Sequence, residues 1–566
     1  AYELIQELST KKDRTQKNHS YPPIAVIGYS CRMPGSQNIT NFWQKLVSGT
    51  NLITSLPKKR KDHLIAFLKQ SSLDYDPEDL EKWKEGFLTE VDTFDAKYFG
   101  ISTAEANLMD PAHRLFLEVS EETIQSAGYS RDQLSGSRIG VFSGQSGSNY
   151  SHVLSECTPL SVTGNHPSFL PARISYLYDF KGPAYSVQST CASSLLAVNL
   201  ACRSLQQQEC EMALVGGANI DVYPPLFFQD QAAATGIMSP KGICRPFDAS
   251  ADGMGRGEAV IAFMLKPLST AEKDGDRIMA VILGSAVNND GHSAAISAPC
   301  PKAQGDVIQA ALAMSQVNPK DLDYIECHGT ATKLGDPIEI QGITNALAPY
   351  QLPRQFCGIG SIKGNMGHAL DGGAGISSLL KVILSLEHEM LPPSIHINEL
   401  NPEIDFLRSP VYPVIHSTPW KRSEKRRIAG VSCFSFNGTN VHMIVSDSPE
   451  KHELHPYPNP KWKNRLSYWI SPDSTKSWSF PKKKNEKPIG VKQIWESILG
   501  PNSAKSEKNF FALGGDSLAL MQLIAECQTQ LNIEIKAAEF LESPSFENLN
   551  QMIISQKQSV KEEVKC

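Results

Sequence analysis

Short apolar runs that alternate with helical segments fill the chain from about residue 24 to about residue 445. The runs have the length and apolar character of buried strands, and the clearest are Ile24–Gly28, Ile139–Gly144, Ala213–Gly217 and Ile278–Leu283. Helical patterns such as Ser193–Gln208 stand between them. Short buried strands that alternate with helices predict a layered α/β architecture.

The alternation stops near Val445, and a segment of different composition follows. From Asp447 to Pro488 the chain contains many charges, no sustained period and prolines at 449, 456, 458, 460, 472, 481 and 488, which is typical of a linker. A flexible coil of about 40 residues has an end-to-end distance of about 35 Å, so the domain after it is able to visit sites on this or a neighbouring unit. We expect the aromatic segment Arg465–Trp469 to dock back on the main body.

Helical spacing returns in the last block of the chain. About 70 residues, from Ile489 to Ile554, suffice for a small helical bundle. At the other end, Leu4, Ile5 and Leu8 give a short helical pattern. We therefore predict five segments: an N-terminal docking or linker helix (1–20), a large α/β domain (21–446), a Pro-rich charged linker (447–488), a small helical domain (489–556) and a tail (557–566).

The composition is that of a globular protein and excludes several classes of partner. The 566 residues carry a formal net charge of -6, and no long basic run interleaves with aromatic residues, which argues against nucleic acid. No apolar run approaches the roughly 20 residues of a membrane span, and the first 20 residues are unlike a secretory signal. The 12 cysteines contain no Cys-x-x-Cys pair, so we expect no metal and a reduced, cytoplasmic setting. Because the chain begins at Ala1, we expect it to be part of a longer protein.

Cys191 stands at the junction of a predicted strand and a predicted helix. The segment Pro183–Gln188 has a strand-and-turn pattern, and Ala192–Leu205 is a helical run without proline. The macrodipole at a helix N-terminus favours a thiolate, so we expect the pKa of Cys191 to be lowered from its free value of roughly 8.5. The alternative is an inert buried cysteine, which the pattern alone does not exclude.

Two histidines lie beside glycines at predicted loop mouths. His328 follows the apolar run Tyr324–Cys327, and His368 precedes the glycine-rich segment Gly372–Gly375. Functional groups concentrate on such loops, and glycine allows a ligand to approach closely. A cysteine served by two histidines is suited to moving an acyl group through a thioester, but a purely structural role for either histidine stays open without proof that they converge.

Ser517 follows Asp516 at the start of a predicted helix in the last block. A serine at this position is suited to carry a tethered thiol. The alternative is an ordinary N-cap serine, which is common at helix starts.

Seven ordered segments resemble the ketosynthase domain of modular polyketide synthases, relatives of the condensing enzymes of fatty-acid synthesis. The match runs from about Pro22 to Val445. The segments that carry it are Ile24–Gly35, Met109–Arg114, Ser189–Ser194, Phe247–Gly253, His328–Pro337, Lys363–His368 and Phe434–Asn440.

This resemblance implies a thiolase-type, five-layered αβαβα fold and a homodimer. It implies that Cys191 is the nucleophile that accepts the acyl chain, and that His328 and His368 hold the thioester carbonyl of a malonyl-type extender, promote its decarboxylation and stabilise the enolate. The resemblance also implies that Lys363 supports the two histidines. The backbone amides of Cys191 and Phe436 would form an oxyanion hole, and the Phe436 side chain would also gate the pocket. Thr330 and Thr332 would contact the pantetheine arm.

The last block resembles an all-α, four-helix carrier domain of polyketide and peptide synthetases. Phe510–Leu518 carries this resemblance, and its Gly-Gly-Asp-Ser sequence is nearer to peptidyl carriers than to the usual acyl carriers. The resemblance implies that Ser517 carries covalent 4'-phosphopantetheine. Tethering raises the local concentration of a substrate arm to about millimolar.

The expected partners follow from these two resemblances. They are acyl thioesters, a malonyl-loaded carrier, a phosphopantetheinyl transferase and a separate acyltransferase that loads extender groups in trans. The expected activity is that of a beta-ketoacyl synthase, an acyltransferase that performs decarboxylative Claisen condensation.

The chain departs from the family pattern near the nucleophile and near the gate. Gln188–Thr190 replaces the usual Asp-Thr-Ala, and Ser435 and Asn437 replace glycines around Phe436. We expect altered substrate choice rather than loss of activity. Two alternatives remain: a homologue that transacylates or decarboxylates without chain elongation, and a non-catalytic module that binds acyl chains.

Overall fold

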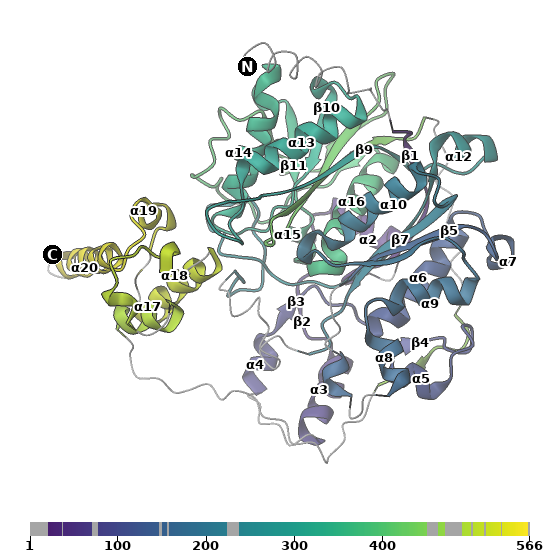
Figure 1. Ribbon diagram of the computed structural model, residues 1–566, viewed down its shortest axis with the longest axis horizontal. Coiled ribbons are helices and arrows are strands. Elements are labelled where there is room, and N and C mark those ends of the chain that lie inside the picture. Colours follow the sequence, from purple (N-terminus) through teal and green to yellow (C-terminus); the bar gives the residue numbers. More distant parts are fainter. Residues whose placement is uncertain are drawn as a thin grey trace, which may run out of the picture.

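The computed structural model contains a large layered body and a small helical bundle (Figure 1). It describes residues 21–563 apart from 37, 71–76, 146–149, 155–157, 224–236, 450–461, 470–489, 500–501, 514–516, 532 and 534. The predicted helix at 1–20 and most of the predicted linker lie outside the described residues, and the four predicted boundaries between segments stay predictions.

One eleven-stranded sheet runs through the large body in the order β13-β11-β10-β15-β16-β9-β1-β8-β7-β5-β6. The bounds in that order are Val411–Pro413, Cys357–Gly360, Leu322–Glu326, Ile428–Phe434, Thr439–Asp447, Ala280–Asn289, Ile24–Arg32, Ala259–Pro267, Met212–Asn219, Ile139–Gly144 and Ala184–Val187. The pairing of β1 with β9 covers Ile24–Val26 against Ala280–Ile282. This short junction divides the sheet into two halves.

Helices cover both faces of each half, as Figure 1 shows. The central layer is α10 (Ser193–Gln206) and α16 (Leu370–Glu387), α6 (Pro111–Ser126) packs on the outside of the β1–β8 half, and α13 (Pro301–Ser315) with α14 (Gly335–Leu347) packs on the outside of the other half. The predicted five-layered αβαβα fold is confirmed.

The continuous apolar runs follow from burial on both faces of the sheet. In β1, Ile24 and Val26 belong to the core beneath the central helices, whereas Ala25 and Ile27 belong to the core beneath α6. Because successive side chains of a strand point to opposite faces, every position of such a strand is apolar.

The remaining elements of the large body are short or peripheral. They are α2 (Ile39–Val47), α3 (Lys58–Gln70), α4 (Pro77–Lys82), α5 (Thr103–Leu108), α7 (Arg131–Leu134), α8 (Pro159–Asn165), α9 (Phe169–Tyr178), α12 (Leu268–Asp274), α15 (Lys363–Met366), β2 (Thr54–Ser55), β3 (Lys84–Glu85), β4 (Thr93–Phe94), β12 (Met390–Leu391), β14 (Thr418–Pro419) and β17 (Leu466–Ser467).

The predicted docking of the aromatic linker segment is confirmed. β17 pairs with β4, Tyr468 is buried, and the Arg465 guanidinium lies 3.0 Å from a carboxylate oxygen of Glu118. The Trp462 indole N–H also donates to Glu122 at 2.9 Å. The chain therefore returns to the large body after β16 before it reaches the bundle.

Within the described residues the bundle contains four α-helices, as predicted: α17 (Val491–Leu499), α18 (Ser517–Leu531), α19 (Ala537–Glu542) and α20 (Phe546–Glu563). The fully buried Trp495 and Phe510 lie at the centre of its core. α20 continues to Glu563, past the predicted start of the tail at residue 557.

A fully buried ion pair ties the central layer to the end of β10. Lys381 Nζ of α16 lies 2.7 Å from Glu326 Oε2, both side chains are wholly buried, and Tyr324 donates to the same oxygen at 2.7 Å. Glu326 Oε1 accepts the backbone N–H of Ile362 at 2.6 Å. The pair therefore fixes the two chain segments that lead to His328 and to Lys363.

We expect Lys381→Ala to lower the free energy of unfolding by about 3 kcal/mol or more, because it leaves a buried carboxylate without its counter-charge. Urea denaturation followed by tryptophan fluorescence measures the loss. The control is Lys302→Ala, which removes an exposed pair with Asp306 and should leave the denaturation midpoint nearly unchanged, because exposed ion pairs contribute little to stability. Equal effects of the two substitutions would contradict this role of the buried pair.

Among the described residues, no helix has both the length and the apolar character needed to cross a membrane.

Candidate functional site

Cys191 lies in a tight turn that leads from the edge strand β6 into the central helix α10. Thr190 adopts a left-handed backbone conformation with φ 44°, which is strained for a β-branched residue. The Ser193 hydroxyl accepts the Ser189 N–H at 2.8 Å and donates to the Thr190 carbonyl at 2.6 Å, which holds the turn. This arrangement sets the Cys191 sulfur at the N-terminal end of the helix layer.

His328 is the second residue after β10 and is held through its backbone. Glu339 of α14 accepts the N–H groups of His328 and Gly329 at 2.7 and 2.8 Å. Ser361 donates to the Gly329 carbonyl at 3.0 Å. The loop that carries His328 is therefore anchored on both sides without use of the imidazole.

His368 stands between α15 and α16, at a point where helix and sheet approach closely. Its backbone N–H donates to Gly255 at 2.7 Å. At Gly372, one turn further, a Cβ atom would lie 2.0 Å from the Ala218 carbonyl oxygen. Only glycine permits this approach of α16 to β7, which fixes the position of His368.

The three side chains converge, although 177 positions separate the first from the last in sequence (368 minus 191). One donor atom each of Cys191, His328 and His368 lies within 4.8 Å of the others. The two imidazole rings are 5.5 Å apart and nearly perpendicular. All three line one cavity of about 940 Å³ including its open mouth. The convergence of the cysteine and the two histidines, which the sequence alone could not prove, is therefore present.

The expectation of a lowered pKa for Cys191 is wrong. Burial raises the pKa of the Cys191 thiol well above its usual range, the carboxylate of Asp371 acts in the same direction, and Lys363 opposes both. The favourable helix N-terminus predicted from sequence does not compensate for removal of the sulfur from water. Cys191 is therefore a neutral thiol at rest and needs a proton acceptor when it attacks.

Both histidines are neutral at rest. Burial lowers the pKa of His328 and of His368 well below the usual value, and the nearby Lys363 ammonium adds to the shift. Neither ring nitrogen of His368 has a hydrogen-bond partner among the described residues. A buried, unpartnered imidazole is costly unless it serves a ligand, so these nitrogens are available to substrate.

Lys363 is buried at the first turn of α15, with only 1% of its surface exposed. Its Nζ has no hydrogen-bond partner in the described part of the chain, and its charge acts on Cys191 and on both histidines. The structure therefore places Lys363 close to the predicted cysteine and the two predicted histidines, where its positive charge acts on all three side chains.

The predicted pantetheine and gate residues line the same cavity. The hydroxyls of Thr330 and Thr332 are 3.3 Å apart in its wall. Phe436 also lines the cavity and is 44% exposed, as a residue at an entrance would be. The oxyanion hole predicted from the amides of Cys191 and Phe436 stays a prediction.

The two departures from the family pattern touch each other. The hydroxyls of Thr190 and Ser435 form a hydrogen bond, and the Asn437 amide donates to the Ser189 hydroxyl at 3.4 Å. Side chains on both sides of Phe436 are therefore tied to the nucleophile turn, contacts that glycines at 435 and 437 would lack.

Sequence reasoning missed three residues of this site. Glu339 and Asp336 of α14 are buried carboxylates that hold the loop after β10, and burial raises their pKa values to about 7 and about 6. Cys433 of β15 lies directly beneath the nucleophile. A carboxylate within the apolar start of a helix was an available signal for Glu339, but a cysteine inside a buried strand gave none for Cys433.

Ser517, the predicted attachment residue, is the first residue of α18. Met521, one helical turn later, lines the cavity that contains Cys191. Four residues of α-helix rise about 6 Å, so the start of α18 lies close to the cavity mouth. Figure 1 shows the bundle beside the large body, and Met521 of α18 brings the bundle to the wall of this cavity.

The donor atoms of Cys191, His328 and His368 also have the spacing of a metal site. A bound cation would have to be held beside the buried Lys363 ammonium, whose charge acts on all three side chains. Like charges at close range repel strongly in a buried site. This observation disfavours a metal, and the absence of a metal remains a prediction.

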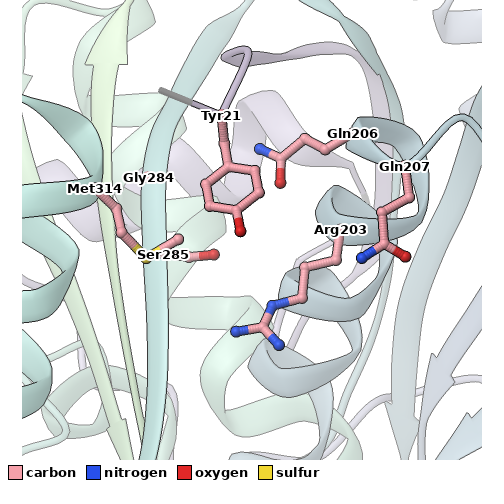
Figure 2. Close-up of a pocket in the computed structure, with 7 residues that line it drawn as sticks. All are labelled: Tyr21, Arg203, Gln206, Gln207, Gly284, Ser285 and Met314. Carbon is pink, nitrogen blue, oxygen red and sulfur yellow. The ribbon is translucent and has the colours of Figure 1, made fainter. Parts of the chain in front are cut away.

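A second cavity lies away from these residues, between α10, β9 and α13. Figure 2 shows Arg203 and Gln206 of α10 facing Ser285 of β9, with the Tyr21 ring between them. The described residues that line this cavity include no cysteine, histidine or carboxylate. It offers no pairing of a nucleophile with a base.

Four family models match consecutive parts of the chain. They are described as the beta-ketoacyl synthase N-terminal domain (residues 22–271), the beta-ketoacyl synthase C-terminal domain (279–398), the ketoacyl-synthetase C-terminal extension (401–474) and the phosphopantetheine attachment site (490–553).

Curated proteins and solved structures agree with these matches. The chain is 40% identical over 464 residues to polyketide synthase PksL of Bacillus subtilis, covering 78% of the chain and 10% of that protein. It is 39% identical over 455 residues to a phenolphthiocerol/phthiocerol polyketide synthase of Mycobacterium tuberculosis, covering 78% of the chain and 28% of that protein. The chain thus spans about a tenth and about a quarter of these relatives.

Two solved ketosynthases resemble the large body. The ketosynthase from module 6 of the bacillaene synthase of Bacillus subtilis matches with a TM-score of 0.68 and 34% identity, covering 75% of this chain and 72% of that one. An oxazolomycin ketosynthase domain from Streptomyces albus matches with a TM-score of 0.69 and 35% identity, covering 76% of each chain.

Proposed function

Because the chain belongs to the beta-ketoacyl synthase family of polyketide synthases and ends in a phosphopantetheine attachment domain, we propose that it performs decarboxylative Claisen condensation between an acyl chain on Cys191 and a malonyl-type thioester. The observation that carries the proposal is the convergence of Cys191, His328 and His368 in one cavity. The identities of the acyl chain and of the final product depend on the whole synthase.

The first half-reaction loads the nucleophile. The Cys191 sulfur attacks the carbonyl carbon of an acyl thioester, a new S–C bond forms, and the bond to the departing thiol breaks. An imidazole accepts the Cys191 proton and returns it to the departing thiolate, which balances the step. A neutral imidazole is required because Cys191 begins as a thiol.

The second half-reaction makes the carbon–carbon bond. The malonyl thioester loses carbon dioxide, and the electron pair of the broken C–C bond forms an enolate. An imidazole N–H group donates to the thioester oxygen as negative charge develops there, and the nearby charge of Lys363 acts on the imidazoles. The enolate carbon attacks the Cys191 thioester, the bond between the acyl carbon and the Cys191 sulfur breaks, and the departing Cys191 thiolate takes up one proton from solvent through an imidazole. Removal of one such donor typically costs about 100- to 1000-fold in rate.

The attachment domain supplies a flexible thiol on which acyl and malonyl groups travel as thioesters. The chain fits this group, since Ser517 begins a helix whose next turn reaches the cavity. Ser517 would hold the group covalently, and Thr330 and Thr332 would bind its arm. The place of Met521 in the cavity wall supports the proposal that the carrier serves its own ketosynthase.

The protein is proposed to act as a homodimer and to receive its groups from a phosphopantetheinyl transferase and a separate acyltransferase. Support for the dimer comes from the edge strand β6, whose Tyr185 is 52% exposed, and from the neighbouring Tyr176, which is 84% exposed. Large exposed aromatic groups at a sheet edge are typical of an interaction surface.

Condensation by acylated protein should vary less than about two-fold between pH 7.5 and pH 6.0. Both histidines act in their neutral form, and burial lowers their pKa values well below 6.5, so they stay neutral across this range. A histidine with an ordinary pKa would be only about one quarter neutral at pH 6. Acylation of Cys191 beforehand removes its own titration, and a rate that falls about four-fold would contradict the assignment.

One experiment tests the proposed function against its alternatives. The phosphopantetheinylated chain is incubated with an acyl thioester and a malonyl-loaded carrier, and intact-protein masses are followed. Acylation of Cys191 and a β-ketoacyl product support the proposal. Carbon dioxide without coupling would identify a decarboxylating homologue, and acylation without any product would identify a binding module.

A further inference from the structure

Cys433 is a second buried thiol in contact with two members of the site. It lies in β15, is completely buried, and packs against Gly375 of α16. Its sulfur lies 3.0 Å from the carbonyl oxygen of Cys191 and 3.7 Å from Nδ1 of His328. The proposed function gives this thiol no role.

The two contacts leave one consistent arrangement of hydrogens. A thiol has a single hydrogen, and the shorter contact directs it to the Cys191 carbonyl oxygen, which is only an acceptor. The sulfur is then left to accept a hydrogen bond from His328. Nδ1 must therefore carry the proton of the neutral ring, and Nε2 must carry the lone pair.

Two further observations support this arrangement. Burial raises the pKa of Cys433 to about 12, so its sulfur keeps its hydrogen. Cys433 is also the one hydrogen-bond partner that the described residues offer to Nδ1 of His328. His368, by contrast, has no partner on either nitrogen among them, so nothing comparable selects its tautomer.

We propose that Cys433 is a positioning residue that holds His328 in its Nδ1–H form, so that Nε2 is the base that accepts the Cys191 proton during acyl loading. The inference rests on the proposed function. In the loading step the proton moves from Cys191 Sγ to Nε2, the new S–C bond forms, and the proton then passes to the departing thiolate. His368 is left as the donor to the malonyl thioester.

The test separates loading from condensation. We expect Cys433→Ala to slow acylation of Cys191 by about 3- to 10-fold, the effect of one lost hydrogen bond, and to change condensation by already acylated protein less than two-fold. Cys433→Ser should restore loading, because a hydroxyl both donates and accepts. The matched control is Cys202→Ala, a buried cysteine of α10 outside the site, which should leave both rates unchanged.

A spectroscopic measurement gives a readout that packing alone would not move. Nitrogen-15 NMR of histidine-labelled protein, with His328→Gln to assign the signal, should show His328 protonated at Nδ1 in the unmodified chain. A mixture of tautomers is expected in Cys433→Ala.

Three results would overturn the proposal: a proton on Nε2 in the unmodified chain, slower condensation with unchanged loading in Cys433→Ala, or an equal loss of both rates. If the unmodified chain loads an acyl group but forms no carbon–carbon bond, the proposed function fails while the loading test of Cys433 still stands.

Discussion

Replacement of Cys191 by alanine should abolish acyl loading of the large body. The reason is chemical, because no other described cysteine lies within 4.8 Å of both His328 and His368 as Cys191 does, and a thioester requires a sulfur beside a proton acceptor. Intact-protein mass after incubation with an acyl thioester should show no adduct on the large body. Tryptic mapping of the unmodified chain should place the adduct on Cys191.

The control for this prediction is Cys244→Ala. Cys244 is equally buried and lies outside the three-residue cluster, so loading should persist in that variant. Loading that persists in Cys191→Ala, on whichever residue, would overturn the assignment of the nucleophile.

Replacement of Ser517 by alanine should abolish attachment of phosphopantetheine. The attachment model covers residues 490–553, and Ser517 begins the helix whose next turn reaches the cavity. Incubation with a phosphopantetheinyl transferase and coenzyme A should add one phosphopantetheine to the unmodified chain and none to Ser517→Ala. Loading of Cys191 from a free acyl thioester should continue, since the two sites are separate.

Ser543→Ala is the matched control, because Ser543 is an exposed serine that follows α19 in the same bundle. It should accept phosphopantetheine as the unmodified chain does. Modification of Ser517→Ala, or its loss in Ser543→Ala, would contradict the assignment of Ser517.

The layered fold was predictable because its local signals agree. Strands buried on both faces read as continuous apolar runs, as Ile24–Gly28 does, and the proline-rich composition after Val445 marks the end of the main body. The positions of Cys191 and His328 at element ends were predictable for the same reason.

The shared cavity was not predictable from spacing, because it arises from the packing of β10, α10 and α16 around a common edge. The pKa of Cys191 was predicted in the wrong direction, since the helix terminus is visible in sequence and the degree of burial is not. Thr190 in a left-handed conformation also escapes sequence reasoning, because β-branched residues disfavour that region.

The hydrogen bond between Thr190 and Ser435 links the two regions in which the chain departs from the family pattern. Each substitution appears isolated in sequence, yet the two side chains form a hydrogen bond in the structure, and Ser435 lines the cavity. Cys433 could not be predicted from sequence either. Its proposed role depends on its short distances to Cys191 and His328, and its own segment gives no signal of them.

The central claim is that one thiol and two imidazoles act together in carbon–carbon bond formation. The most direct measurement is a single turnover of acylated, phosphopantetheinylated chain with malonyl thioester labelled at the free carboxyl group. Labelled carbon dioxide and β-ketoacyl product are counted in the same sample. One carbon dioxide released for each ketone formed is the predicted result, and carbon dioxide released without a matching ketone would contradict the account.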